Sequence, residues 1–147
     1  MEYHLKMPII YTGGTFDLFH SGHTSLLKRC KELSGIDGKV VVGLNSDEFV
    51  LRYKSKRPIL SESERTELLL SCRFVDEVVL NVGDENSKPA IESCKANYIV
   101  IGSDWARKDY YAQMNFDQDW LDEMNIGLIY LPYTKNISTS EIKNRIL

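Results

Sequence analysis

The sequence predicts an α/β domain built on one doubly wound parallel sheet of about five strands, with helices on both faces. Short apolar segments alternate along the chain with segments whose apolar residues recur at helical spacing, the pattern of parallel βαβ units. The length, 147 residues, is that of one ordinary domain. No repeat, low-complexity tract or linker divides the chain, so residues 1–147 are expected to form a single domain.

Each strand is expected where a short apolar run is bounded by turn residues. The second run is rich in β-branched residues, as strands buried on both faces are. In chain order the strands are expected over residues 7–11, 39–44, 75–80, 98–102 and 128–131.

Each helix is expected where apolar residues recur three or four apart, behind a start signal. Ser61 with Glu64, and Ser138 with Glu141, have the spacing of a capping box. Pro89 suits a first helical turn, where its missing N–H is not needed. The helices are expected to begin near residues 24, 46, 61, 87, 114 and 138, which completes a Rossmann-like alternation of strands and helices.

Composition excludes several classes of protein. The chain has 18 basic and 21 acidic residues, so a nucleic-acid partner is not expected. No apolar run approaches the roughly 20 residues that span a bilayer, and the first residues lack the order of a signal peptide. We therefore expect a cytoplasmic protein without a membrane partner. Three scattered cysteines predict free thiols rather than disulfides or a zinc site.

The segment after the first expected strand carries the clearest functional signal, because ligands of such sheets bind at the carboxyl ends of strands. Its glycines let backbone approach a ligand, and the following helix N-terminus attracts phosphate. His20 and His23 are three residues apart, so their rings can face the same way. A structural cap or half of a metal site is the alternative. A nucleotide phosphate site fits better, because zinc sites usually take three or four ligands.

Gly14-Thr15-Phe16-Asp17 followed by His20-x-Gly22-His23 resembles the HxGH signature of the nucleotidyltransferase superfamily. The likeness runs from the first strand to the last helix, and the chain is most similar to the glycerol-3-phosphate cytidylyltransferase branch. The other segments that carry it are Ser46–Phe49, Glu64-Arg65, Arg73–Val78, Gly102–Trp105 and Ile137–Ser140.

This resemblance implies an enzyme that moves CMP from CTP to a small phosphorylated alcohol, with glycerol 3-phosphate as the best guess, and releases pyrophosphate. An acceptor phosphate is mostly ionised at pH 7, because its second pKa is about 6, so no general base is needed. The site must instead align two polyanions and neutralise the charge that develops during transfer. The resemblance also implies Mg²⁺ bridged by phosphate oxygens, without protein ligands to the metal, and a homodimer.

The resemblance assigns roles to particular residues. His20, His23 and Lys54 are the expected catalytic residues, and Lys54 and Arg73 are expected to bind the acceptor. The simpler alternatives are solvated surface charge for Lys54 and Lys56, and an ion pair with Asp76 or Glu77 for Arg73. Asp17 and Asp76 are expected to hold loops and helix ends, and Asp47 is expected to cap a helix. The expected nucleotide-binding residues are Gly14, Thr15, Phe16, His20, His23, Lys56, Asp104, Trp105, Thr134, Ile137, Ser138 and Thr139.

Two departures from the family pattern leave the acceptor and the base open. Tyr133 stands where the pattern has an arginine, and Lys135 is the candidate to supply that charge. The stretch between Asp104 and Leu131 is longer than in the glycerol-phosphate enzymes by about one helix. CTP is favoured because residues 102–105 resemble the cytidylyl branch. The alternatives are an ATP-dependent adenylyltransferase, as in the heptose-phosphate and flavin branches, and a non-catalytic nucleotide-binding module.

Overall fold

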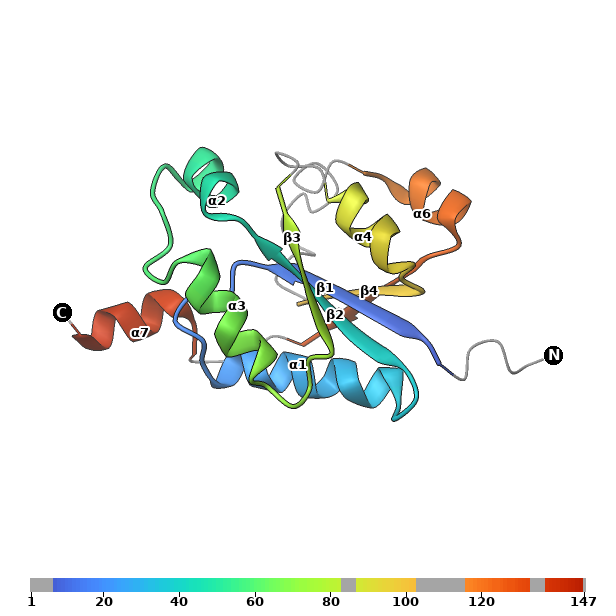
Figure 1. Cartoon of the computed structure of the whole chain (residues 1–147), viewed down its shortest axis with the longest axis horizontal. Coiled ribbons are helices and arrows are strands. Elements are labelled where there is room, and N and C mark those ends of the chain that lie inside the picture. The colour runs from blue at the N-terminus through green and yellow to red at the C-terminus, as the bar shows by residue number, and fades with distance from the viewer. Residues whose placement is uncertain (1–6, 83–86, 103–115, 133–136, 147) are drawn as a thin grey trace.

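The computed structural model describes residues 7–82, 87–102, 116–132 and 137–146. They contain a five-stranded sheet in the order β3-β2-β1-β4-β5, in which every neighbouring pair is parallel. The α/β class and the parallel sheet are therefore confirmed. The strands are β1 (Ile9–Gly14), β2 (Lys39–Asn45), β3 (Glu77–Asn81), β4 (Tyr98–Gly102) and β5 (Gly127–Leu131) (Figure 1).

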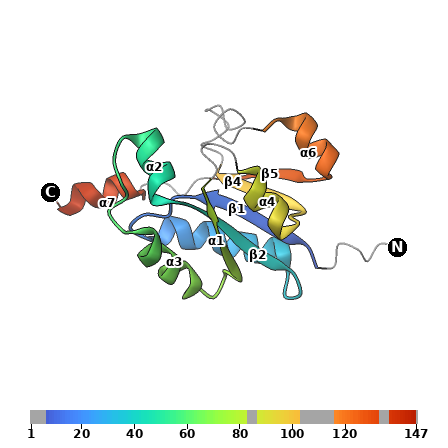
Figure 2. The same cartoon turned by 45° about the horizontal axis from the view of Figure 1, so that its top comes forward.

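Helices cover both faces of the sheet, as a doubly wound fold requires. Figures 1 and 2 show α1 and α3 on one face, and α4 and α6 on the other. None of the described helices combines the length and apolar character needed to cross a bilayer. The helices are α1 (Ser21–Ser34), α2 (Asp47–Lys54), α3 (Glu62–Leu70), α4 (Lys88–Cys94), α6 (Gln118–Met124) and α7 (Thr139–Ile146).

Two hydrophobic clusters bury the two faces of the sheet. Alternate residues of one strand point to opposite faces, so Ile10 of β1 joins one cluster and Tyr11 joins the other. Leu27 of α1 packs in the cluster of Ile10, and Ile91 of α4 packs in the cluster of Tyr11. β1 lies at the centre, and the chain turns to opposite sides of it to build β2 and β4. The carboxyl ends of β1 and β4 therefore flank the switch point where such folds bind ligands.

Helix ends show where local patterns succeed and fail. Ser46 caps α2, and Ser61 with Glu64 forms the expected capping box of α3. α1 begins at Ser21, three residues before the expected start, because His20 caps it and histidine is not a usual capping residue. At α7 only half of the expected box forms: Ser138 accepts a hydrogen bond from the Glu141 N–H. The Glu141 side chain instead pairs with Arg145.

Candidate active site

The connection from β1 to α1 brings the two histidines of the HxGH segment into contact. Nδ1 of His20 accepts a hydrogen bond from the Gly22 N–H at 3.1 Å, and the His20 N–H donates to Nδ1 of His23 at 3.2 Å. Their rings stack with centroids 3.7 Å apart. The two side chains thus form a reciprocal capping box at the N-terminus of α1.

This arrangement fixes the protonation of both rings. An Nδ1 atom that accepts a hydrogen bond carries no proton, so the neutral ring carries its proton on Nε2. Burial lowers the pKa of His20, and burial together with the neighbouring His20 lowers the pKa of His23 to about 3. Both imidazoles are therefore neutral at pH 7, and each retains one Nε2–H donor that the cap does not use.

Gly22 is required by the close approach of the histidine pair. A Cβ at this position would lie 2.9 Å from Cε1 of the His20 ring and 3.2 Å from a methyl carbon of Ile137. Any side chain at position 22 would therefore displace either the cap or the segment before α7. This contact explains why glycine stands between the two histidines.

The loop between β1 and α1 is held by side-chain contacts rather than by regular structure. Phe16 and Leu18 both have positive φ, 53° and 49°, which non-glycine residues seldom adopt. The Asp17 carboxylate accepts hydrogen bonds from the N–H groups of Leu18, Ile59 and Leu60 at 2.8–3.0 Å. Asp17 is thus a structural residue, as expected, and it ties this loop to the loop before α3.

A cavity of about 150 Å³ opens beside the histidines, between α1 and the carboxyl ends of β1 and β4. The structure also places at it residues that sequence reasoning did not single out: Ser25, Leu26 and Arg29 of α1, and Ile101 of β4. These residues lack a local motif, so the sequence offered no signal for them beyond the helical spacing of the first three and the apolar strand run that contains Ile101. The expected nucleotide-binding residues that line it are Gly14, Thr15, Phe16, His20, His23 and Ile137.

The start of α7 meets the same loop. The Thr139 hydroxyl donates to the Asp17 carbonyl at 2.8 Å, and the Ser138 hydroxyl caps the helix. The capping role expected for Ser138 is confirmed. These contacts bring the N-terminus of a second helix beside the one that the histidines cap.

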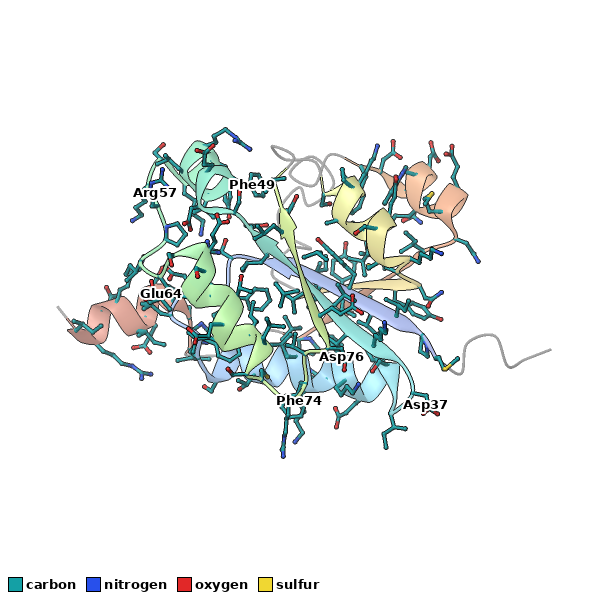
Figure 3. All side chains as sticks on the ribbon, viewed as in Figure 1. Asp37, Phe49, Arg57, Glu64, Phe74 and Asp76 are labelled. Atoms are coloured by element: carbon teal, nitrogen blue, oxygen red, sulfur yellow. The ribbon has the colours of Figure 1, made fainter. Side chains whose placement is uncertain are left out.

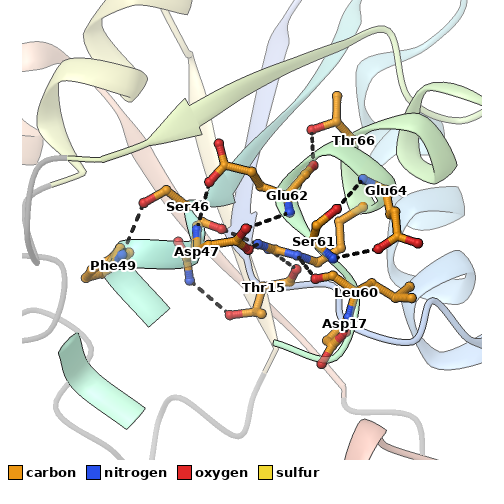
Figure 4. Close-up of polar contacts among 12 residues, drawn as sticks. Thr15, Asp17, Ser46, Asp47, Phe49, Leu60, Ser61, Glu62, Glu64 and Thr66 are labelled. Atoms are coloured by element: carbon orange, nitrogen blue, oxygen red, sulfur yellow. Dashed lines mark hydrogen bonds and ion pairs between the residues drawn. The ribbon is translucent and has the colours of Figure 1, made fainter. Parts of the chain in front are cut away.

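Behind the β1–α1 loop, a buried arginine joins three segments of the chain. Arg65 of α3 is fully buried and donates to the carbonyls of Thr15, Asn45 and Leu60 at 2.8–3.0 Å. Its guanidinium also pairs with Asp47 at 2.6 Å. Figure 4 shows this Arg65 cluster, in which Asp47 and Glu62 also exchange backbone-to-carboxylate hydrogen bonds. Asp47 is therefore structural, although it holds α3 rather than capping its own helix.

The two lysines stand at the carboxyl edge but not in the wall of the cavity. Lys54 and Lys56 are exposed, and the Lys54 Nζ lies 5.7 Å from the centre of the Tyr53 ring. The Tyr53 hydroxyl is 3.1 Å from the Thr15 hydroxyl, so the end of α2 is tied to the β1–α1 loop. Their expected substrate contacts stay a prediction.

Arg73 lies at the other end of the sheet, before β3 begins. Figure 3 shows Phe74 and Asp76 at that end and Arg57 at the opposite one. The Arg73 guanidinium lies 5.0 Å from the centre of the Phe74 ring. The alternative ion pairs expected for Arg73 are wrong, because Asp76 pairs with Lys31 and Glu77 pairs with Lys39. Its acceptor-binding role stays a prediction. Within one chain, Arg73 lies at the end of the sheet opposite the cavity, so the fold does not support that role.

Several expected site residues cannot be placed on this framework. Asp104, Trp105 and Thr134 lie outside the described residues, as do Tyr133 and Lys135. Their assignments stay predictions.

Comparison with known proteins agrees with this geometry. The sequence profile described as cytidylyltransferase-like matches residues 11–145. The chain is 36% identical to the glycerol-3-phosphate cytidylyltransferase of Bacillus subtilis over 140 residues, which cover 95% of this chain and 98% of that protein. It is 33% identical to the FAD synthase of Korarchaeum cryptofilum over 145 residues, covering 94% and 90%. The crystal structure of a lipopolysaccharide core biosynthesis protein from Thermoplasma volcanium superposes with a TM-score of 0.68 at 25% identity, covering 89% and 99%.

Proposed function

We propose that this chain, which belongs to the cytidylyltransferase-like family, transfers CMP from CTP to a small phosphorylated alcohol and releases pyrophosphate. The observation that carries the proposal is the pair of neutral histidines, whose free Nε2–H donors stand at a helix N-terminus beside the cavity. Glycerol 3-phosphate is the first acceptor to test, because the likeness to the Bacillus enzyme covers nearly all of both chains.

The reaction is a single in-line displacement. An oxygen of the acceptor phosphate forms a bond to the α-phosphorus of CTP as the bond from that phosphorus to the bridging oxygen breaks, and the electron pair leaves with pyrophosphate. The acceptor oxygen needs no base, since its second pKa is near 6. The chain has to bind and align the two substrates and neutralise the growing charge.

The described residues divide this work. The Nε2–H groups of His20 and His23 donate to phosphate oxygens, and the N-termini of α1 and α7 add their partial positive charge. Apolar side chains such as Leu26 and Ile101 enclose the nucleoside. Lys54 and Lys56 are assigned to the acceptor and the triphosphate, because α2 is tied to the same loop through Tyr53.

The expected ligands of Mg²⁺ are phosphate oxygens of the nucleotide rather than side chains of the protein. Among residues 7–82, 87–102, 116–132 and 137–146, no group of three or more His, Cys, Asp or Glu side chains is placed to hold a metal ion. Phosphate oxygens are the usual magnesium ligands in such reactions, and the bound ion would neutralise phosphate charge. We expect the enzyme to act in the cytoplasm as a homodimer.

ATP is the second candidate donor, because the FAD synthase of Korarchaeum cryptofilum matches almost as much of the chain at similar identity. Pyrophosphate release decides between the two. The purified protein is incubated with Mg²⁺ and either CTP or ATP, against glycerol 3-phosphate, phosphocholine, phosphoethanolamine and polyol phosphates. We expect release with CTP and one acceptor. Release with ATP alone would reject CTP as the donor, and binding of CTP without turnover on any acceptor would favour a non-catalytic module.

A further inference from the structure

One cation in the cavity wall has no partner among the residues that the structure describes. Arg29 is half-buried in the third turn of α1, and its guanidinium makes no hydrogen bond or ion pair with any residue that the structure describes. By contrast, Lys31, Lys39 and the fully buried Arg65 each form an ion pair with a carboxylate. No described residue accepts a hydrogen bond from the five donors of this guanidinium, and the side chain lines the cavity.

The position of Arg29 separates it from the phosphate end of the cavity. Gly22, Ser25, Leu26 and Arg29 form one stripe along α1, with the spacing of a single helix face. Arg29 follows His23 by six residues, about 9 Å along the helix axis. Because Arg29 begins this far along the helix, its side chain lines the cavity at a distance from the N-terminal turn that the histidines cap.

That part of the cavity has the character of a nucleobase site. The apolar side chains of Leu26 and Ile101 line the cavity with Arg29, and Gly102 and Pro132 lie at the strand ends. A flat ring fits between apolar walls, and a donor at the end of the cavity can bond only to acceptor atoms on the edge of that ring.

We propose that Arg29 selects the base of the bound nucleotide by donating a pair of hydrogen bonds to O2 and N3 of cytosine. The inference rests on the proposed function and deepens it. On its pairing edge, cytosine presents two neighbouring acceptors, O2 and N3, which suit the planar fork of a guanidinium. Adenine and uracil present no two neighbouring acceptors, since every acceptor on the pairing edge lies beside a donor or a C–H group. Guanine has such a pair in O6 and N7, so GTP is an informative competitor.

The test measures equilibrium binding of CTP, ATP, UTP and GTP, each with Mg²⁺, to four proteins. These are the wild type, Arg29→Met, Arg29→Lys and the control Lys28→Met, which removes an exposed cation from the same helix without touching the cavity. We expect Arg29→Met to bind CTP about 5- to 150-fold more weakly, the range of discrimination that one bidentate arginine–base pair provides. ATP binding should change little, and Lys28→Met should match the wild type.

Arg29→Lys separates base recognition from simple charge. Lysine keeps the positive charge and loses the planar fork, so it should recover only a small part of the lost CTP affinity. Equal loss of CTP and ATP in Arg29→Met, with recovery of both in Arg29→Lys, would make Arg29 a phosphate cation and overturn the inference. Unchanged CTP binding in Arg29→Met would overturn it while the proposed function stands. A wild type that binds ATP and not CTP would reject both. Thermal unfolding of each variant shows that the protein is folded.

Discussion

Two polar clusters lie at the carboxyl edge of the sheet, and they differ in what they leave unpaired. Around Arg65, the guanidinium bonds to three backbone carbonyls and to Asp47, while Asp47 and Glu62 bond to each other's backbone. Around His20 and His23, the hydrogen bonds of the cap use only the Nδ1 atoms. The first cluster is complete within the chain, whereas the second keeps two donors beside a cavity.

This difference distinguishes polar groups that stabilise the fold from polar groups that remain open to a ligand. A buried polar group costs free energy unless it is hydrogen-bonded, so the Arg65 cluster is stable because its bonds are made. The histidine pair is only partly buried, and its Nε2–H groups can be satisfied by water until a phosphate arrives. Removing a residue from the first cluster should therefore affect mainly stability, and removing one from the second should affect mainly turnover.

The largest expected effect is on stability. Arg65→Met leaves Asp47 without its ion pair and three carbonyls without a donor, so the free energy of unfolding should fall by about 3–5 kcal/mol. Urea denaturation of the two proteins measures this. Arg145→Met is the matched control, since Arg145 forms an exposed pair with Glu141 on α7, and the change should cost less than about 0.5 kcal/mol. Equal losses of unfolding free energy in the two variants would show that the buried ion pair contributes no more to stability than the exposed one.

The second effect is on turnover. His20→Ala removes one donor to the phosphates, so kcat should fall by about 10²–10³-fold while CTP affinity changes modestly. The variant also loses the cap of α1, which costs about 1 kcal/mol of stability. His20→Asn restores an acceptor for the Gly22 N–H without restoring the Nε2–H group, so it should regain stability and remain slow. Wild-type turnover in either variant would contradict the role of His20.

Sequence reasoning located the histidine pair because both partners and the glycine between them lie within four residues. The Arg65 cluster could not be found in this way, because its bonds reach back 18, 20 and 50 residues, to Asp47, Asn45 and Thr15. Arg29 was missed for a related reason: its face of α1 becomes a cavity wall only when β4 and the segment before α7 are placed against it. Strands and class were predictable, since both depend on local periodicity.

A smaller effect is expected on the pH dependence of stability, and it comes from His23 in the histidine pair. His23 is held neutral in the folded protein, where its pKa is about 3, whereas an unfolded histidine titrates near 6.5. Below pH 6.5 the unfolded state therefore binds a proton that the folded state does not. This difference should lower the free energy of unfolding by about 2 kcal/mol between pH 6.5 and 5.

His23→Asn keeps an acceptor at the cap and removes the titrating ring. Urea denaturation of the variant and the wild type at several pH values should show stabilities that converge above pH 7, with the wild type declining more steeply below pH 6.5. Parallel profiles would mean that His23 is protonated as easily in the folded protein as in the unfolded chain.

The smallest expected effect compares two serines that cap helices, Ser61 next to the Arg65 cluster and Ser138 beside the histidine loop. Each hydroxyl accepts a hydrogen bond from the N–H three residues later, at 3.2 and 3.0 Å, so Ser→Ala should cost about 1 kcal/mol of stability at either site. At α3 the Glu64 carboxylate closes the box by accepting from the Ser61 N–H. At α7 Glu141 pairs with Arg145 instead, so the N-terminus keeps its positive character for an anion.

Ser138→Ala should therefore raise the KM for CTP as well as lower stability, whereas Ser61→Ala should lower stability alone. Steady-state kinetics and urea denaturation of the two variants give both quantities. An unchanged KM in Ser138→Ala would remove α7 from the phosphate site and leave the histidine cap of α1 to bind the triphosphate. A raised KM in both would mean that loosening either helix disturbs the β1–α1 loop, since Asp17 is bonded both to the segment before α3 and to Thr139. Only a KM for CTP that rises in Ser138→Ala and not in Ser61→Ala would show that the N-terminus of α7 binds the nucleotide.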